Sequence, residues 1–145
     1  MYFVDRSQMR QTLAYIDRLL EELDQHSFET SIEKIGLERI THMVIESILD
    51  VGNMMIDGFI MRDPGSYEDI IDILIDEKVL PQQDEQPYKA VIQLRKSIVQ
   101  DYLNIDHQEI KATMMAHKET LKSYSLHIQT YLGDELGVAH AFSNE

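Results

Sequence analysis

The residues most able to do chemistry lie in one segment, residues 94–106, with the sequence LRKSIVQDYLNID. A cation, an amide and a phenol, at Arg95, Gln100 and Tyr102, stand there among apolar residues whose spacing predicts a helix. A guanidinium on an apolar stripe must meet an acid, a carbonyl group, water or a bound anion, because an unpaired charge is costly to bury. The segment therefore predicts either an anion site or an interhelical ion pair at Arg95.

The geometry of a regular helix limits how these side chains can act together. Seven residues return a side chain to nearly the same face, so a helix over residues 88–103 would align Tyr88, Arg95 and Tyr102. Gln100 would lie about 140° around the axis from Arg95. One helix alone cannot bring both of these side chains to a single reacting atom.

The charge of the chain bears on the kind of anion it can bind. Thirteen Lys and Arg against 26 Asp and Glu give a net charge of −13, which repels polyanions unless a local basic patch overcomes the field. Screening confines that field to about 8 Å at physiological salt, which leaves room for a small recessed site. The candidate basic cluster is Lys89, Arg95 and Lys96, partly offset by Asp101. The charge therefore counts against broad nucleic-acid binding, and no DNA binding is expected, but it leaves this cluster as the candidate for a small anion site.

The helices that must position this segment follow from apolar residues at three- and four-residue steps. They are predicted over residues 6–25, 30–61, 66–81, 88–103 and 106–133. An Asp-Pro-Gly break ends the second helix at residues 63–65, residues 82–87 are a predicted loop, and residues 134–145 are an expected frayed tail. Gly52 and Gly58 either weaken the second helix by about 1 kcal/mol each or let another helix approach closely. Short connections predict an all-α bundle of four to five mostly antiparallel helices.

Length and composition predict one domain over residues 1–145, since 43% of the 145 residues are hydrophobic and can form a single core. The absence of cysteine excludes disulfides and thiolate metal sites. Residues 1–10 show no apolar run behind a basic start, and no apolar run of about eighteen residues occurs anywhere. We therefore expect a cytoplasmic protein with no signal peptide and no membrane association.

Segment 94–106 resembles the signature of the HepT-like branch of the HEPN superfamily, which is Arg, four residues, His, one residue and Tyr. Gln100 stands at the position of that His, and Lys96 stands where many relatives have Asn. The likeness covers about residues 30–115. It includes three further stretches, at residues 37–39, 63–67 and 102–106.

The resemblance implies a small helical ribonuclease toxin that forms a homodimer, with the motif helices of two subunits facing each other across a cleft. The family's Arg, here Arg95, would hold an RNA phosphate, while the His position, here Gln100, would transfer a proton in metal-independent cleavage. Tyr102 matches the hydroxyl that a cognate nucleotidyltransferase antitoxin modifies with AMP. Because a primary amide does not titrate near neutral pH, we expect a toxin–antitoxin ribonuclease homologue with severely weakened or absent cleavage.

The alternative is a non-catalytic helical dimer that binds a nucleotide, RNA or a protein partner through the Arg95 cleft. Arg39, Glu46 and Asp50 share a polar stripe of the second predicted helix. They either pair with Arg95 or face solvent, and solvent is the favoured interpretation because most such charges contribute little to stability.

The six histidines do not predict a metal site. Di-iron bundles use Glu-x-x-His pairs on two helices, whereas the nearest approach here is a single Glu38 with His42, four residues apart. The chain has neither a Gly-rich phosphate loop nor a nucleophile elbow, and no cofactor is expected. The eight methionines are interpreted as core filling.

Overall fold

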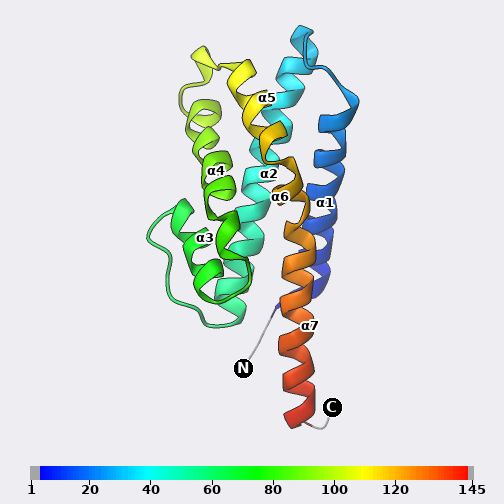
Figure 1. The fold of residues 1–145 in the computed structure, drawn as a ribbon, viewed down its shortest axis with the longest axis vertical. Coiled ribbons are helices and arrows are strands. Elements are labelled where there is room, and N and C mark those ends of the chain that lie inside the picture. The colour runs from blue at the N-terminus through cyan, green and yellow to red at the C-terminus, as the bar shows by residue number, and fades with distance from the viewer. Residues whose placement is uncertain (1–3, 144–145) are drawn as a thin grey trace.

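The computed structural model describes the backbone of residues 4–143 and the side chains of residues 4–133. All regular secondary structure within residues 4–143 is helical, as the sequence predicts. The α-helices are α1 (Arg6–Gln25), α2 (Ser31–Gly58), α3 (Tyr67–Asp76), α4 (Glu85–Val99), α5 (His107–Ala116), α6 (Lys118–Lys122) and α7 (Tyr124–Ser143) (Figure 1). Two short 3-10 helices, η1 (Gln82–Asp84) and η2 (Tyr102–Asn104), lie before and after α4. Within the part of the chain that the structure describes, no helix is both long and apolar enough to cross a membrane.

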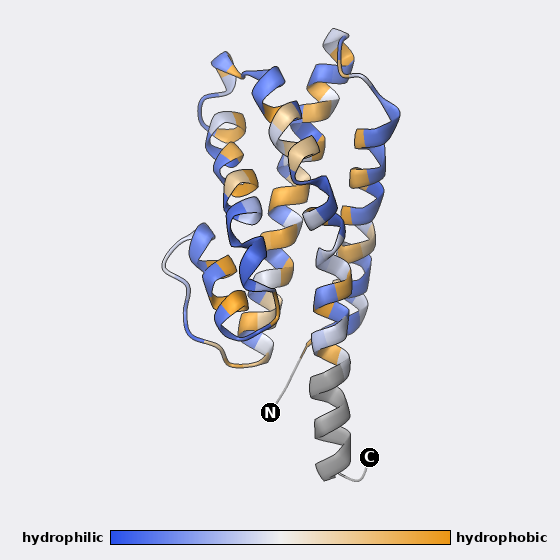
Figure 2. Ribbon diagram, in the orientation of Figure 1, coloured by the Kyte–Doolittle hydropathy of each residue, from blue (hydrophilic) through white to orange (hydrophobic). Residues whose placement is uncertain are grey.

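The helices form an up-down-up-down bundle around α2, which Figure 1 shows at its centre. α1 and α4 run antiparallel to α2, and the chain then returns along α5, α6 and α7. The short α3 packs against α2 and α4 on one side of the bundle. Figure 2 shows apolar residues on the sides of the helices that face one another. The prediction of a bundle of mostly antiparallel helices is confirmed.

Capping residues fix where the first two helices begin. Asp5 accepts a hydrogen bond from the backbone N–H of Gln8 at 3.0 Å, at the start of α1. At the start of α2 the Glu33 N–H donates to Thr30 Oγ1 at 3.2 Å, and the Thr30 N–H donates to Glu33 Oε1 at 3.1 Å. These bonds satisfy N–H groups that have no partner within a helix. The caps thereby set which residues of α2 stand opposite α4 and α5.

The contact between α2 and α3 requires glycine at position 52. A Cβ atom there would lie 2.5 Å from Cγ2 of Ile70, closer than two such carbon atoms can approach. Gly52 is therefore explained by the close approach of another helix, one of the two alternatives that the sequence leaves open. This contact holds α3 against α2, with Tyr67 at its first position.

Several predicted helix boundaries are wrong. α2 and α3 end at Gly58 and Asp76, both earlier than predicted. α4 begins at Glu85, inside the predicted loop at residues 82–87. Pro87 falls in the first turn of α4, where the N–H group that proline lacks would have no helical partner. Pro87 is therefore compatible with the first turn of a helix, and it does not indicate that the loop continues.

The end of α4 separates Tyr102 from Arg95. The predicted helix reaches residue 103, but the N–H groups of Gln100 and Asp101 both donate to the carbonyl oxygen of Lys96, at 2.9 and 3.1 Å, and the helix stops. Tyr102 consequently belongs to η2. The predicted alignment of Tyr102 with Arg95 on one helical face is wrong.

The predicted helix over residues 106–133 is divided into α5, α6 and α7. The break between α6 and α7 has a local cause at the carbonyl oxygen of Thr120. It accepts hydrogen bonds from Oγ of Ser123 at 2.6 Å and from the hydroxyl of Tyr88 at 3.2 Å. Side-chain donors of this kind compete with the regular helical bonds, and no glycine or proline marks the break in the sequence.

The end of the chain is described only in part. The backbone of α7 is helical as far as Ser143. Side chains beyond Gly133, and residues 144–145 as a whole, lie outside the described residues. The expected fraying of residues 134–145 stays a prediction.

Candidate functional site

Arg95 is held by side chains from two neighbouring helices. Its Nε donates to Oε1 of Glu46 on α2 at 2.6 Å, and its guanidinium carbon lies 4.6 Å from the centre of the Tyr67 ring on α3. The hydrogen bond to Glu46 raises the pKa of Arg95 above its ordinary value, so the cation is retained at all physiological pH. The sequence left open whether the polar stripe on α2 pairs with Arg95 or faces solvent. Glu46 pairs with Arg95.

The rest of the guanidinium is free to bind an anion. Within the described residues only Nε of Arg95 forms a hydrogen bond, which leaves both terminal nitrogens without a partner. Arg95 borders an open groove of about 420 Å³ between α3 and the second half of α4. The groove is lined by Ser66, Tyr67, Glu68, Ile92, Gln93, Arg95, Lys96 and Gln100. Two terminal N–H donors beside a second cation match the geometry of a bound phosphate.

The groove brings together three of the predicted site residues, Arg95, Lys96 and Gln100. Gln100 is exposed and immediately follows α4, so the turn after the helix presents its amide to the same hollow. Glu68 adds one carboxylate to the groove and accepts a hydrogen bond from Nε2 of Gln93 at 3.2 Å. The groove lining therefore holds two cations and one carboxylate, and Glu46 behind Arg95 adds a second carboxylate to the cluster.

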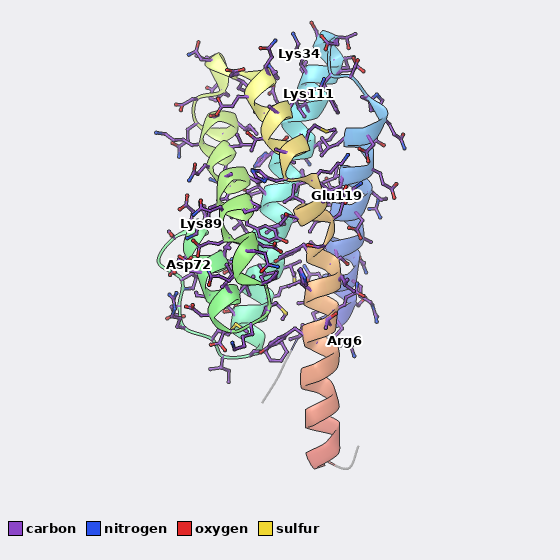
Figure 3. All side chains as sticks on the ribbon, viewed as in Figure 1. Arg6, Lys34, Asp72, Lys89, Lys111 and Glu119 are labelled. Carbon is purple, nitrogen blue, oxygen red and sulfur yellow. The ribbon has the colours of Figure 1, made fainter. Side chains whose placement is uncertain are left out.

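Three other predicted site residues do not line the groove. Nζ of Lys89 lies 2.7 Å from Oδ1 of Asp72 on α3, and this hydrogen bond raises the pKa of Lys89; Figure 3 labels both residues at the side of the bundle. Asp101 is exposed. Tyr102 projects from η2 with 64% of its surface exposed. Their roles in binding or modification stay predictions.

Three residues around Arg95 change the sequence-based interpretation. Tyr67 carries no sequence feature that marks it as a partner of Arg95. Nε2 of His42, on α2, lies 3.5 Å from Oε1 of Glu46, a pair that the sequence analysis did not propose. The four-residue spacing of His42 and Glu46 is the feature that predicts such a pair.

Partial burial and repulsion from Glu46 raise the pKa of Asp50, which is not a partner of Arg95.

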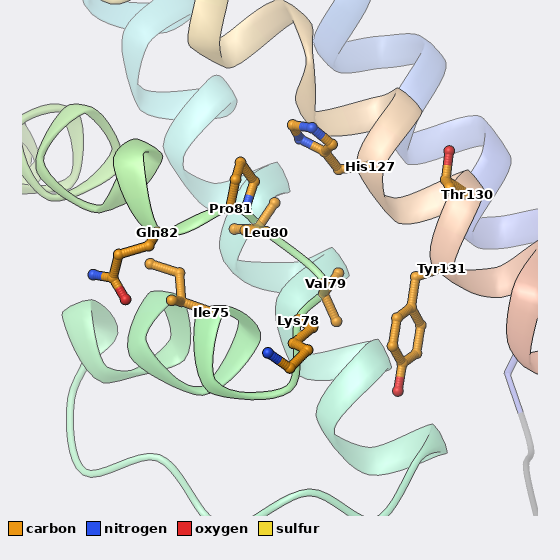
Figure 4. Close-up of a pocket in the computed structure, with 9 residues that line it drawn as sticks. All are labelled: Ile75, Lys78, Val79, Leu80, Pro81, Gln82, His127, Thr130 and Tyr131. Carbon is orange, nitrogen blue, oxygen red and sulfur yellow. The ribbon is translucent and has the colours of Figure 1, made fainter.

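A second hollow lies near the other end of α4. Figure 4 shows this space of about 430 Å³ between the turn that follows α3 and α7, with Lys78 and Gln82 on one side and His127 on the other. Nδ1 of His127 is 4.0 Å from Oδ2 of Asp84. None of the predicted site residues lines this hollow. Within residues 4–133, no group of three or more His, Asp or Glu side chains is arranged to hold a metal ion.

The fold and the motif define a class of protein. A family model described as Ribonuclease HepT-like matches residues 9–128, and the chain belongs to this family. The chain is 47% identical over 143 residues to a protein of Bacillus subtilis (strain 168) named "Putative RNase YutE", and the match covers 98% of this chain and 99% of that relative. A solved structure of YutE, described as a cytosolic protein of unknown function, matches with a TM-score of 0.92 at 47% identity and covers 94% of this chain and 96% of that one. The predicted resemblance is confirmed.

Proposed function

We propose that this protein is a metal-independent endoribonuclease that binds an RNA phosphate at Arg95. The observation that carries this proposal is the orientation of Arg95. Glu46 takes only Nε, so both terminal nitrogens are free at the wall of the groove. Membership of the HepT-like ribonuclease family supports RNA as the substrate.

The chemical role of Arg95 follows from the charge that develops during cleavage. The phosphorus gains a fifth oxygen and extra negative charge in the transition state, and a preorganised cation stabilises that charge more than it stabilises the ground state. Glu46 and Tyr67 hold Arg95 from two sides, so little reorganisation is needed. Lys96 adds a second cation beside the groove. We expect RNA binding to weaken as salt rises.

The rate should be low because of the residue at position 100. Gln100 lines the groove but can only donate and accept hydrogen bonds. A placed general acid or base contributes a factor of about 10²–10⁴ to the rate of a reaction. We therefore expect slow cleavage compared with a site that carries histidine at position 100.

We further propose that two copies of the chain pair beside the groove. The residues that end α4 and form η2 expose apolar side chains: Val99 is 36% exposed, Tyr102 64% and Leu103 84%. Such a cluster on one turn is costly to leave in water and suits a second copy. The substitution Leu103→Asp should convert a dimer to a monomer, as measured by sedimentation equilibrium. An unchanged mass would place the contact elsewhere.

The same exposure supports a regulated toxin. In a single chain Tyr102 is exposed on η2, and we propose that a cognate nucleotidyltransferase antitoxin transfers AMP to its hydroxyl before two copies pair. Protein purified from its native cells should carry an AMP adduct on the peptide that contains Tyr102. Tyr102→Phe should abolish the adduct, and an adduct on another residue would contradict this assignment.

The test of the main proposal is cleavage of a mixed RNA pool with chelator present, by wild type and by Arg95→Ala. Chelator-resistant cleavage that disappears with Arg95 supports a metal-independent nuclease. Cleavage equal in both proteins would identify a contaminating nuclease. If wild type binds RNA in an Arg95-dependent manner without cleaving it, the non-catalytic binding module is the better account.

A further inference from the structure

Two ion pairs attach the motif segment to one face of α2. Nε of Arg95, near the end of α4, binds Glu46 at 2.6 Å, and Nε2 of His107, at the start of α5, binds Oε2 of Glu38 at 2.7 Å. Glu38 and Glu46 are separated by about two helical turns. His42 lies midway between them on the same stripe of α2. The turn that joins Arg95 to His107 is therefore fixed at both ends opposite His42.

α2 and α4 pack against each other and run in opposite directions (Figure 1). Because the two helices run in opposite directions, moving one turn from Glu46 towards the start of α2 goes the same way along the bundle as moving one turn from Arg95 towards the end of α4. Each turn rises about 5.4 Å. This spacing puts His42 at about the height of the last turn of α4. What ties His42 to Arg95 is a shared partner: Oε1 of Glu46 lies 2.6 Å from Nε of Arg95 and 3.5 Å from Nε2 of His42, so an imidazole from another helix belongs to the Arg95 cluster.

We propose that His42 supplies the proton transfer that Gln100 cannot, an inference that rests on the proposed ribonuclease function. The side chain of His42 is 30% exposed, and its Nε2 lies 3.5 Å from Oε1 of Glu46, the oxygen that also accepts from Arg95. Within the described residues Nδ1 of His42 forms no hydrogen bond, so one ring nitrogen is free to exchange a proton with RNA. Glu46 positions both the cation and the imidazole.

The reaction that His42 would assist uses the RNA's own 2′-hydroxyl as nucleophile. The imidazole accepts the proton of this hydroxyl as the bond from O2′ to phosphorus forms and the bond from phosphorus to O5′ breaks. The leaving 5′ oxygen takes a proton from water. The imidazolium then gives the accepted proton to the resulting hydroxide, so no metal or redox partner is required. The products are a 2′,3′-cyclic phosphate and a free 5′-hydroxyl.

The charged groups that face His42 come from three helices. Glu38, Arg39 and Glu46 lie within about one turn of it on α2, and Arg39 forms no ion pair among the described residues. α4 contributes Arg95, and the start of α5 contributes His107. If the imidazole of His42 accepts the proton during cleavage, its replacement changes the pH profile of the reaction, and this change is a readout that a purely structural role would not give.

The experiment compares RNA cleavage, with chelator present, by wild type, Arg95→Ala, His42→Gln, His42→Ala and His26→Gln. His26→Gln is the matched control, because His26 also pairs with a glutamate four residues away, Glu22, at 3.0 Å, whereas only His42 shares its glutamate with Arg95. Thermal unfolding verifies that each variant is folded. We expect His42→Gln to cleave RNA about 10²-fold more slowly than wild type and to lose the acidic limb of the pH profile of cleavage. We expect His42→Ala to regain activity when imidazole is added. His26→Gln should match wild type.

The other outcomes overturn the inference in distinguishable ways. If His42→Gln cleaves as wild type does while Arg95→Ala is inactive, the ribonuclease function stands and His42 is not the proton-transfer group. If the His42 variants lose activity with an unchanged pH profile and no rescue by imidazole, His42 has only a structural role. If wild type cleaves no RNA, the proposed function fails and this inference fails with it.

Discussion

Two arginines of this protein form ion pairs in different ways. Arg62 binds Asp69 with both terminal nitrogens, Nη1 to Oδ2 at 2.8 Å and Nη2 to Oδ1 at 2.9 Å. Arg95 binds Glu46 through Nε alone, at 2.6 Å. The side chain of Arg62 is 51% exposed on a loop, whereas that of Arg95 is 22% exposed between helices. The more exposed arginine is thus the one whose terminal nitrogens are already occupied.

The difference indicates how one residue type can serve structure, as Arg62 does, or binding, as we propose for Arg95. The bidentate pair of Arg62 uses the two nitrogens that a phosphate would need. Asp69 also accepts from the backbone N–H of Gly65 at 2.9 Å, so this pair closes the loop before α3. Glu46 holds Arg95 by the nitrogen nearest the chain and leaves the terminal pair for a ligand. The two arginines are therefore distinguished by which guanidinium nitrogens form the ion pair, more than by how exposed each side chain is.

The largest expected effect follows from replacing each arginine by alanine. Arg95→Ala should reduce RNA cleavage by about 10³-fold, because a cation preorganised for the transition-state charge is lost. Arg62→Ala should cleave RNA at the wild-type rate and unfold at a lower temperature. Initial rates on a labelled RNA, with chelator present, and thermal unfolding provide the two measurements. Equal losses of cleavage in both variants would show that the comparison does not separate binding from structure.

A smaller effect is expected from restoring the family residue at position 100. Gln100→His should raise the rate of RNA cleavage by about 10²-fold, because an imidazole at this position can protonate the leaving 5′ oxygen, a step that water performs in the wild type. Gln100→Asn is the control, since it keeps an amide at this position. A correctly folded Gln100→His without a gain in rate would mean that the groove does not place position 100 at the reacting atoms.

The aromatic ring under Arg95 should affect binding more than chemistry. Its guanidinium carbon lies 4.6 Å from the centre of the Tyr67 ring, a contact that contributes about 0.5–1 kcal/mol at partly exposed sites. Tyr67→Leu should therefore weaken RNA binding by about two- to fivefold at fixed salt, and Tyr67→Phe should preserve it. Fluorescence anisotropy with a short RNA measures both. Equal weakening in the two variants would assign the effect to the phenol hydroxyl.

Helix class and the groove residues of α4 can be predicted from the sequence because both depend on local spacing. The partners of Arg95 are harder to predict. Glu46 is one of several charges on a polar stripe, and ranking such charges by their usual small contribution favours solvent. Tyr67 reaches Arg95 only because Gly52 lets α3 approach α2 closely. No local pattern encodes that distance.

The ends of the helices depend on tertiary contacts in the same way. The carbonyl of Thr120 accepts from Tyr88, a residue 32 positions earlier in the chain, at the break between α6 and α7. The helical spacing of apolar residues continues through this break, so the sequence pattern does not predict it. The early end of α4, at Val99, likewise lacks glycine or proline. It places Tyr102 off the helix, which is why its predicted alignment with Arg95 fails.

The smallest expected effect is the contribution of the Arg62 pair to the acid dependence of stability. The hydrogen bond from Arg62, with that from the Gly65 N–H, lowers the pKa of Asp69 from 3.8 to about 2. Because the pKa is lower in the folded protein, ionised Asp69 stabilises the fold above about pH 4, and this contribution is lost as pH falls towards 2. Asp69→Asn should be less stable than wild type at pH 7, and the difference should narrow as pH falls from 4 to 2.

Urea unfolding across this pH range tests the prediction and the comparison of the two arginines together. Asp57→Asn is the matched control, because Asp57 is exposed on α2 and forms no ion pair among the described residues. Arg62→Ala should show the same narrowing as Asp69→Asn, since either change removes the pair. Arg95→Ala leaves the Arg62–Asp69 pair in place, so Asp69→Asn should show the same narrowing when it is combined with Arg95→Ala. A narrowing that requires Arg95 would contradict the assignment of this acid dependence to the Arg62 pair.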